Sequence, residues 1–425
     1  MFSSILFGIL GLSVLIAIAF AFSDNRKAVD WKLVTAGIAL QLLFACIVIV
    51  LPGGREFFEA LSRIFVRVIS FASDGAIFVF GNIGDPSSNL GFIFAFQVLP
   101  TIIFFASLMS VLYHLGLMQK VVQAMAWVML KVMRISGSES LSVAANVFVG
   151  QTEAPLVVRP YIARMTQSEL LTMMVGGMAT IAGGVLAAYI TMLGGGDEAL
   201  RVYYAKHLLS ASVMAAPATI VLAKILKPET EESLTKGDVR IHVERTATNV
   251  IEAAANGAAD GVRLALNVGG MLIAFIALIA LVNYPLGWIG EIVGLEAVLG
   301  QPLSLSLILG YVLSPLAWII GVPWQDAITV GGLLGEKIVA NEFVAYTHLN
   351  EIQNTLTPKG LLISTYALCG FANFASIAIQ LGGIGGLAPE RRPDLARFGL
   401  RAVLGGALAT MMTATIAGVL TGMVN

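Results

Sequence analysis

Charged residues are scarce in this sequence. Only 12% of its 425 residues are Asp, Glu, Lys or Arg, whereas 57% are hydrophobic. A water-soluble domain could not bury that much apolar surface, so the composition excludes a soluble globular protein and indicates a polytopic helical membrane protein. The net charge of −1 and the scattered basic residues argue against a nucleic-acid partner.

Cysteine and histidine are rare as well. The two cysteines, Cys46 and Cys369, both lie in apolar segments, and the four histidines are dispersed along the chain. This pattern supplies neither a disulfide framework nor paired metal ligands. It also lacks a Ser-His or Cys-His set, so we do not expect an enzyme that uses its buried acids for catalysis.

Long apolar runs are abundant. A bilayer is crossed by a helix of roughly 20 residues, and runs of that length predict about eight transmembrane helices. They lie near residues 3–22, 33–51, 92–115, 169–193, 205–226, 264–284, 360–383 and 398–423. Segments 54–72 and 118–134 are amphipathic and basic, which is typical of interfacial helices.

Two further apolar segments, 135–163 and 325–347, are interrupted at their centres by Gly, Pro, Asn or Glu. We predict that each is a re-entrant helical hairpin that enters and leaves on one side of the membrane. Three crossings separate them, so the second hairpin enters from the side opposite to the first. Broken helices arranged as inverted repeats are typical of secondary transporters.

The predicted organisation has four parts. Residues 1–90 form peripheral N-terminal helices with an interfacial helix, and residues 227–250 form a hydrophilic cytoplasmic linker. The first repeat, 91–226, consists of a scaffold helix 92–117, hairpin 135–163, broken helix 169–193 and helix 205–226. The second repeat, 251–425, consists of scaffold helix 264–285, hairpin 325–347, broken helix 360–383 and last helix 398–423. Basic residues concentrate in the segments expected on the cytoplasmic side, which places both termini outside.

Glu153 and Glu342 lie at the centres of the two hairpins. An ionisable group inside a membrane costs at least about 2.5 kcal/mol unless it is paired or lines an aqueous cavity, so both acids indicate a translocation site. Their polar neighbours are Gln151, Thr152, Asn341, Asn373 and Ser376. This mixture of donors and acceptors suits a neutral hydroxylated or heterocyclic solute. A proton relay, a cation site and a structural role for a single group remain alternatives.

Three segments resemble the signature segments of the concentrative nucleoside transporters. They are NVFVGQTEAPL at 146–156, VANEFVAY at 339–346 and ALCGFANFASI at 367–377. The likeness extends over nearly the whole chain. It implies a nucleoside symporter of the inner membrane that works by alternating access and assembles as a homotrimer, with a nucleoside such as uridine as substrate and the sodium ion as coupling ion.

The resemblance also implies the site residues. The nucleobase would contact Gln151, Thr152, Glu153 and Val185. The ribose would be held by Glu342, Phe371, Asn373 and Ser376. Sodium would be bound by the Asn146 side chain, the carbonyls of Val149 and Ile181, and the Thr180 hydroxyl. Relatives often carry Ser where this chain has Thr180.

Two other transport mechanisms compete with sodium symport. Some relatives are coupled to protons, but Asn146 and Thr180 do not titrate, whereas a proton mechanism needs a carboxylate with a raised pKa. A channel is disfavoured, because hairpins that enter from opposite sides provide two gates and imply alternating access. The sequence leaves open the purine or pyrimidine preference and the number of ions.

Overall fold

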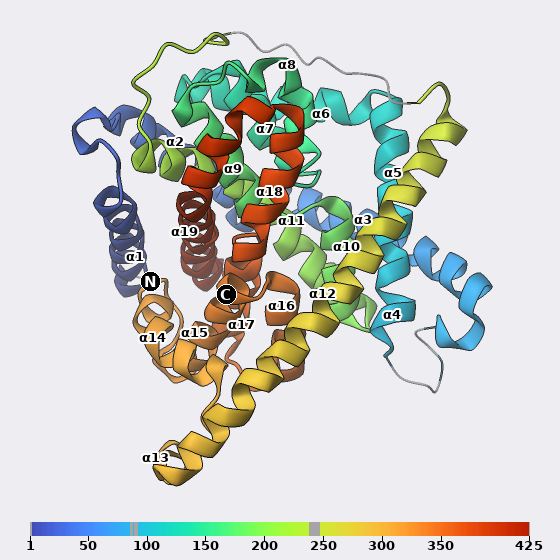
Figure 1. The fold of residues 1–425 in the computed structure, drawn as a ribbon, viewed down its shortest axis with the longest axis vertical. Helices are drawn as coiled ribbons and strands as arrows, with labels where there is room; N and C mark the ends of the chain where they lie inside the picture. The colour runs from blue at the N-terminus through green and yellow to red at the C-terminus, as the bar shows by residue number, and fades with distance from the viewer. Residues whose placement is uncertain (1, 86–87, 89–91, 238–246, 425) are drawn as a thin grey trace.

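The computed structural model describes residues 2–85, 88, 92–237 and 247–424. Within these ranges the regular elements are helices, and the single β-bridge joins Ser136 to Lys236 (Figure 1). Because lipid offers no hydrogen bonds, a membrane-spanning chain must satisfy its backbone internally, which helices do. The predicted all-α membrane fold is confirmed.

Eight described helices, some of them continued or interrupted by a short break, are long and apolar enough to cross a membrane. These spans are Ser4–Ala21 in α1, Trp31–Val50 in α2, Pro52–Ile83 in α3, Phe94–His114 in α4 and α5, Gln167–Gly194 in α9 and α10, Glu198–Leu226 in α11, Val250–Ile292 in α12, and Pro389–Gly422 in α19. The helices themselves are α1 (Phe2–Ala21), α2 (Trp31–Ala45), α3 (Pro52–Phe80), α4 (Phe94–Gln97), α5 (Leu99–His114), α9 (Gln167–Ala179), α10 (Gly183–Gly194), α11 (Glu198–Leu226), α12 (Val250–Ile292) and α19 (Arg392–Val424).

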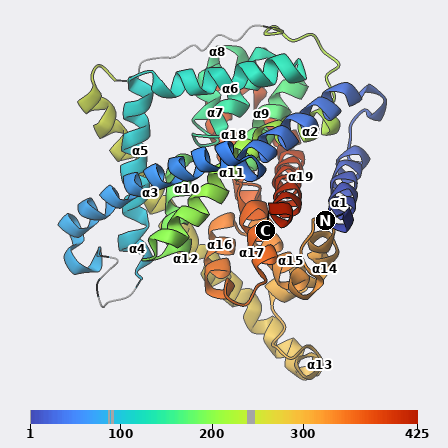
Figure 2. The same ribbon diagram turned by 180° about the vertical axis from the view of Figure 1, so that it is seen from behind.

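This set differs from the predicted one at four places, of which the predicted crossing 360–383, absent from the eight spans, is described with the hairpins below. The expected interfacial helix 54–72 belongs to α3, which has 29 residues and crosses the back of the molecule obliquely to α5 (Figure 2). The predicted crossing 264–284 is the middle of α12, which has 43 residues. Helix α14 (Leu305–Ile319) was not predicted, and it forms a pair bent by 118° with α15 (Trp324–Val339).

The segments predicted as hairpins and broken helices consist of short helices separated by breaks, and the break after α7 is followed by a 3-10 helix at Ala154–Val158. The first hairpin segment contains α7 (Gly137–Asn146) and α8 (Arg159–Ile162), and the second contains α15 and α16 (Glu342–Ile352). The predicted crossing 360–383 is divided into α17 (Pro358–Leu368) and α18 (Phe374–Leu387). The remaining helices are α6 (Leu117–Met133) and α13 (Leu295–Leu299). The division into two inverted repeats stays a prediction.

The helices form a buried centre and an exposed flank. Helices α9, α10, α11 and α19 are buried along most of their length, whereas α12 is largely exposed. Both views show α12 beside α5, and these two helices pack against each other along one side of the molecule (Figures 1 and 2). The break between α9 and α10 therefore lies in the buried centre, and the α5–α12 pair forms a wall beside it.

The predicted cytoplasmic linker begins with a structured segment. Lys224, near the end of α11, forms ion pairs with Glu139 at 2.6 Å and Glu229 at 3.1 Å. Thr235 accepts a hydrogen bond from the Ser138 amide at 3.1 Å, and its carbonyl accepts one from Gly137 at 2.8 Å. The segment 227–237 thus fastens the start of α7 to the end of α11, which the linker interpretation did not foresee.

We expect Lys224→Met to destabilise the protein by about 3–5 kcal/mol, because it leaves buried Glu139 without its ion-pair partner. Thermal unfolding in detergent measures the effect. Lys227→Met is the matched control, since Asp24 pairs with Arg401 as well as with Lys227, at 3.3 Å, and keeps that second partner; we expect a loss of about 0–1 kcal/mol. Equal effects of the two substitutions would contradict a structural role for the buried pair.

Candidate functional site

The break between α15 and α16 places Glu342 at the first position of a helix. Asn341 has extended backbone (φ −167°, ψ 172°), and its side-chain oxygen accepts a hydrogen bond from the Val344 amide at 2.9 Å. This is N-capping, which starts the new helix and satisfies one of its free amides. The Glu342 carboxylate is buried next to the positive end of α16, where the helix dipole stabilises a negative charge.

Two donors from other helices bind the Glu342 carboxylate. The Tyr189 hydroxyl on α10 donates to Oε1 at 3.1 Å, and Asn373 Nδ2 donates to Oε2 at 2.9 Å. Asn373 is itself the N-cap of α18, because its Oδ1 accepts from the Ser376 amide at 2.8 Å. One side chain therefore starts α18 and orients the acid of the second hairpin.

The first hairpin joins this network through Gln151. Gln151 Nε2 donates to the Ser376 hydroxyl at 3.1 Å, and its Oε1 accepts from Gln380 Nε2 at 3.1 Å. Gln380 also donates to the Met174 carbonyl on α9 at 2.9 Å. Glu342, Asn373, Ser376 and Gln151 thus form one continuous hydrogen-bonded chain between the two hairpin segments.

The other predicted substrate residues lie beside this network. Thr152 packs against Gly383, where an added Cβ would lie 2.7 Å from Thr152 Cγ2. Val185 is buried on α10, one turn before Tyr189, and Phe371 is half-buried in the break between α17 and α18. The described hydrogen bonds do not connect Thr152, Val185 or Phe371 to Glu342.

Unlike Glu342, Glu153 lines a cavity. Its carboxylate accepts a hydrogen bond from the Gly150 amide at 3.2 Å and lines a cavity of about 510 Å³. The opposite wall comes from α5 and α12 and includes Tyr113 and Asp260. The two acids that the sequence placed in equivalent positions therefore differ, since Glu342 is enclosed and Glu153 is open to a cavity.

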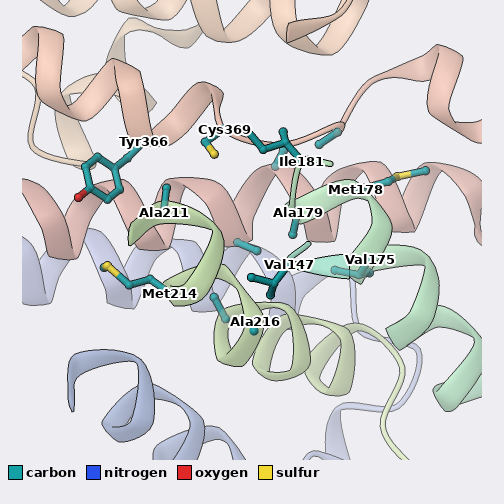
Figure 3. Close-up of a cluster of buried hydrophobic side chains, with 14 of the residues drawn as sticks. Val147, Val175, Met178, Ala179, Ile181, Ala211, Met214, Ala216, Tyr366 and Cys369 are labelled. Carbon is teal, nitrogen blue, oxygen red and sulfur yellow. The ribbon is translucent and has the colours of Figure 1, made fainter. Parts of the chain in front are cut away.

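The two broken helices approach each other at their breaks. A Cβ added to Gly370 would lie 2.9 Å from the Met178 carbonyl, so only glycine allows this close approach. Figure 3 shows Ala179 and Ile181 from the first break near Cys369 from the second, among buried apolar side chains. The predicted sites of the two hairpins thus share one apolar centre.

Of the predicted cation ligands, Asn146 is the last residue of α7 and Val149 follows three residues later, whereas Thr180 and Ile181 lie in the break after α9. Asn146 Nδ2 donates to the Ser142 carbonyl at 2.9 Å, whereas Asn146 Oδ1 is buried and has no hydrogen-bond partner among the described residues. The Gly183 amide donates to the Phe148 carbonyl at 3.0 Å, which holds the first break against the turn after α7. A buried oxygen without a donor costs about 1–3 kcal/mol unless it is satisfied, and a hard cation such as sodium binds neutral oxygens of this kind.

Two residues of the network, Tyr189 and Gln380, are absent from the sequence-based list. Asn373, Ser376 and Gln380 have the i, i+3, i+7 spacing that places side chains on one face of a helix, so this spacing could have indicated Gln380. Tyr189 follows Val185 by four residues and shares its face of α10. Apart from Thr191, its neighbours on α10 are apolar, and a tyrosine in such a setting is also found in ordinary cores.

Family models match most of the chain. A model described as Na+ dependent nucleoside transporter N-terminus matches residues 10–83, one described as nucleoside recognition (Gate) matches 95–196, and one described as Na+ dependent nucleoside transporter C-terminus matches 207–418.

Similar proteins are bacterial and mammalian. An uncharacterized transporter of Haemophilus influenzae is 47% identical over 99% of both chains. Sodium/nucleoside cotransporter 1 of Rattus norvegicus is 42% identical over 96% of this chain and 63% of its own length. The structure of CNTnw in an inward-facing substrate-bound state has a TM-score of 0.90 and 43% identity, covering 98% of this chain and 99% of that one. A substituted CNTnw in an outward-facing state also has a TM-score of 0.90, with 42% identity over 99% of this chain and 98% of that one.

We expect Glu342→Gln to abolish solute uptake. The substitution replaces one carboxylate oxygen by an amide donor, which then faces the donors Tyr189 or Asn373 and leaves them unsatisfied, at about 1–3 kcal/mol for each group. Uptake into proteoliposomes and size-exclusion chromatography measure activity and assembly. Glu351→Gln, at an exposed position of the same helix, should retain uptake. Near-normal uptake by Glu342→Gln would remove Glu342 from the site.

Proposed function

Because the chain belongs to the Na+-dependent nucleoside transporter family, we propose that it imports nucleosides across the inner membrane by symport with sodium. The observation that carries this proposal is the hydrogen-bonded chain Glu342–Asn373–Ser376–Gln151, which joins both hairpin segments inside the protein. Members of this family are transporters and not enzymes, so we assign these residues to solute binding and not to catalysis.

The second hairpin would hold the ribose. A carboxylate accepts two hydroxyl donors well, and Glu342 already accepts two hydrogen bonds from neutral donors. Ribose hydroxyls would replace or join Tyr189 and Asn373 at the same oxygens. Ser376 adds a hydroxyl on the adjacent turn, and Phe371 adds an apolar face.

The first hairpin would contact the nucleobase. Gln151 presents an amide that both donates and accepts, and it uses both functions in the present structure. Thr152 and Glu153 follow directly, and Val185 provides an apolar wall on α10. An amide or hydroxyl can reorient to match different base edges, so this half of the site would tolerate several bases.

Sodium would bind where the first hairpin meets the first break. The ligands would be Asn146 Oδ1, the carbonyls of Val149 and Ile181, and the Thr180 hydroxyl, which now donates to the Gly176 carbonyl at 2.9 Å. The unsatisfied Asn146 oxygen supports this assignment. Proton coupling is the alternative, and none of these four groups titrates.

Transport would proceed by alternating access. Related structures have outward-facing and inward-facing states, and the cavity beside Glu153 opens between the first hairpin and the α5–α12 wall. The placement of basic residues supports external termini. The homotrimer is taken from the family resemblance, and the exposed apolar side chains of α12, such as Leu266, Ile273 and Leu281, would be covered there either by lipid or by a neighbouring subunit.

Uridine uptake into proteoliposomes tests the coupling ion. We expect an inward sodium gradient to drive accumulation in the presence of a protonophore, because the proposed ion ligands are neutral oxygens. Replacement of sodium by choline provides the control. Equal uptake in both buffers, together with stimulation by external acid, would establish proton coupling instead.

Competition experiments test the two halves of the nucleoside site. We expect 2′,3′-dideoxyuridine and free uracil to compete poorly with labelled uridine, because they lack the hydroxyls that would donate to the charged Glu342 carboxylate, and a hydrogen bond to a charged group contributes about 1.5–3 kcal/mol. Cytidine and adenosine should compete better, since Gln151 and Thr152 can reorient. If uracil competes as well as uridine, the assignment of the second hairpin to ribose is wrong.

A further inference from the structure

The two broken helices are interrupted after α9 and after α17, and the ends of α9 and α17 lie in different chemical environments. In the second, the buried Lys337 of α15 extends its Nζ to the carbonyl of Ala367, in the last turn of α17, at 2.8 Å. The same Nζ donates to the Thr410 hydroxyl of α19 at 2.9 Å. Carbonyls in the last turn of a helix have no intrahelical donor and carry the negative end of the helix dipole. The Lys337 ammonium therefore places a positive charge at the end of α17, and this cation is part of the chain itself.

In the corresponding region of the first broken helix, the described residues present unsatisfied oxygens instead. Asn146 is the last residue of α7, and its Oδ1 is buried without a partner. Thr219 of α11 is fully buried, and its hydroxyl is also without a partner. Both side chains approach Gly176 of α9, where an added Cβ would lie 3.3 Å from Asn146 Nδ2 and 3.7 Å from Thr219 Cγ2. Two unsatisfied oxygens thus lie on neighbouring side chains beside the last turn of α9.

Thr219 and Thr410 hold equivalent places in the chain. Each lies on the long helix that follows a broken helix, α11 after α9 and α10, and α19 after α17 and α18. Their local sequences are also alike, APAT at 216–219 and ALAT at 407–410. Thr410 accepts a hydrogen bond from an ammonium group, whereas Thr219 has no partner in the described structure.

We propose that the Lys337 ammonium is a permanent cation of the second broken helix, where it binds the oxygens at the end of α17 as a transported cation binds those at the end of α9 in the first. In this proposal Thr219 helps to bind the transported cation. Glu342, five residues after Lys337, supplies a nearby negative charge. The second hairpin then closes without an ion of its own, and one cation crosses with each nucleoside. This inference rests on the proposed function, since it assumes that a cation is transported.

A matched pair of isosteric substitutions tests it, Thr219→Val and Thr410→Val. We expect Thr219→Val to raise the sodium concentration at half-maximal thermal stabilisation about tenfold, the effect of losing one polar interaction of about 1.4 kcal/mol. Thr410→Val should leave this concentration unchanged, because the Lys337 ammonium, and not sodium, is bound at Thr410. Choline chloride provides the salt control. Equal shifts for both variants, or a shift for Thr410→Val alone, would overturn the inference.

Lys337→Asn gives the second hairpin segment an asparagine, the residue type that Asn146 provides in the first. We expect its uptake to require a second sodium ion, so that the Hill coefficient for sodium rises from about one to above one. The charge moved per uridine, measured as transport current against labelled uptake, should rise with it. If Lys337→Asn folds and keeps the sodium dependence of the wild type, the inference is wrong. If it does not fold, the two threonine variants decide.

The outcomes separate this inference from the function on which it rests. If neither the uptake nor the thermal stability of the wild-type protein depends on the sodium concentration, the sodium symport proposal is overturned. A wild-type protein that responds to sodium but moves two charges per uridine would overturn only the role of Lys337.

Discussion

Backbone groups at a helix break inside a membrane must find a partner, because lipid provides none. This chain interrupts helices at four places near its centre, and side chains complete the interrupted ends. Asn341 and Asn373 cap the starts of α16 and α18, and Lys337 binds a carbonyl at the end of α17. The same two asparagines belong to the candidate site, so the requirement that stabilises the breaks also gathers buried polar atoms around Glu342.

Asn373 shows how closely the two roles are joined. Its oxygen caps α18, and its amide donates to Glu342. A group engaged at both ends has little rotational freedom, so the carboxylate is oriented before any ligand arrives, and less entropy is lost on binding. Tyr189 acts from the opposite side, on a helix that belongs to the first predicted repeat. The acid of one hairpin is therefore oriented in part by the other half of the chain.

Much of the fold follows from local sequence, and the exceptions have physical reasons. Gly, Pro, Asn and Glu within apolar runs located both hairpin breaks, because these residues interrupt helices or start new ones. Helix α14 was missed although residues 302–324 carry no charge and are long enough to cross a membrane, so this segment belonged among the apolar runs. Tyr189 and Gln380 could not be assigned to the site from sequence alone, since their importance comes from contacts between helices far apart in the chain. The segment 227–237 was taken for a linker because it is hydrophilic, yet its polar groups face the ends of α7, α9 and α11.

The hydrogen-bonded chain between the hairpins also bears on how binding could couple to movement. Gln151 and Ser376 are bonded to each other in the present structure, so a nucleoside that enters between them must break this bond and offer new ones. Such an exchange changes the net free energy by only about 0.5–1.5 kcal/mol per bond, which allows the solute to leave again. The decisive condition is that every group finds a partner in the new arrangement. A solute that satisfies only one hairpin leaves polar groups of the other buried and unpaired, at a larger cost. Selectivity would then arise from the need to complete both halves at once, and not from the strength of any single contact.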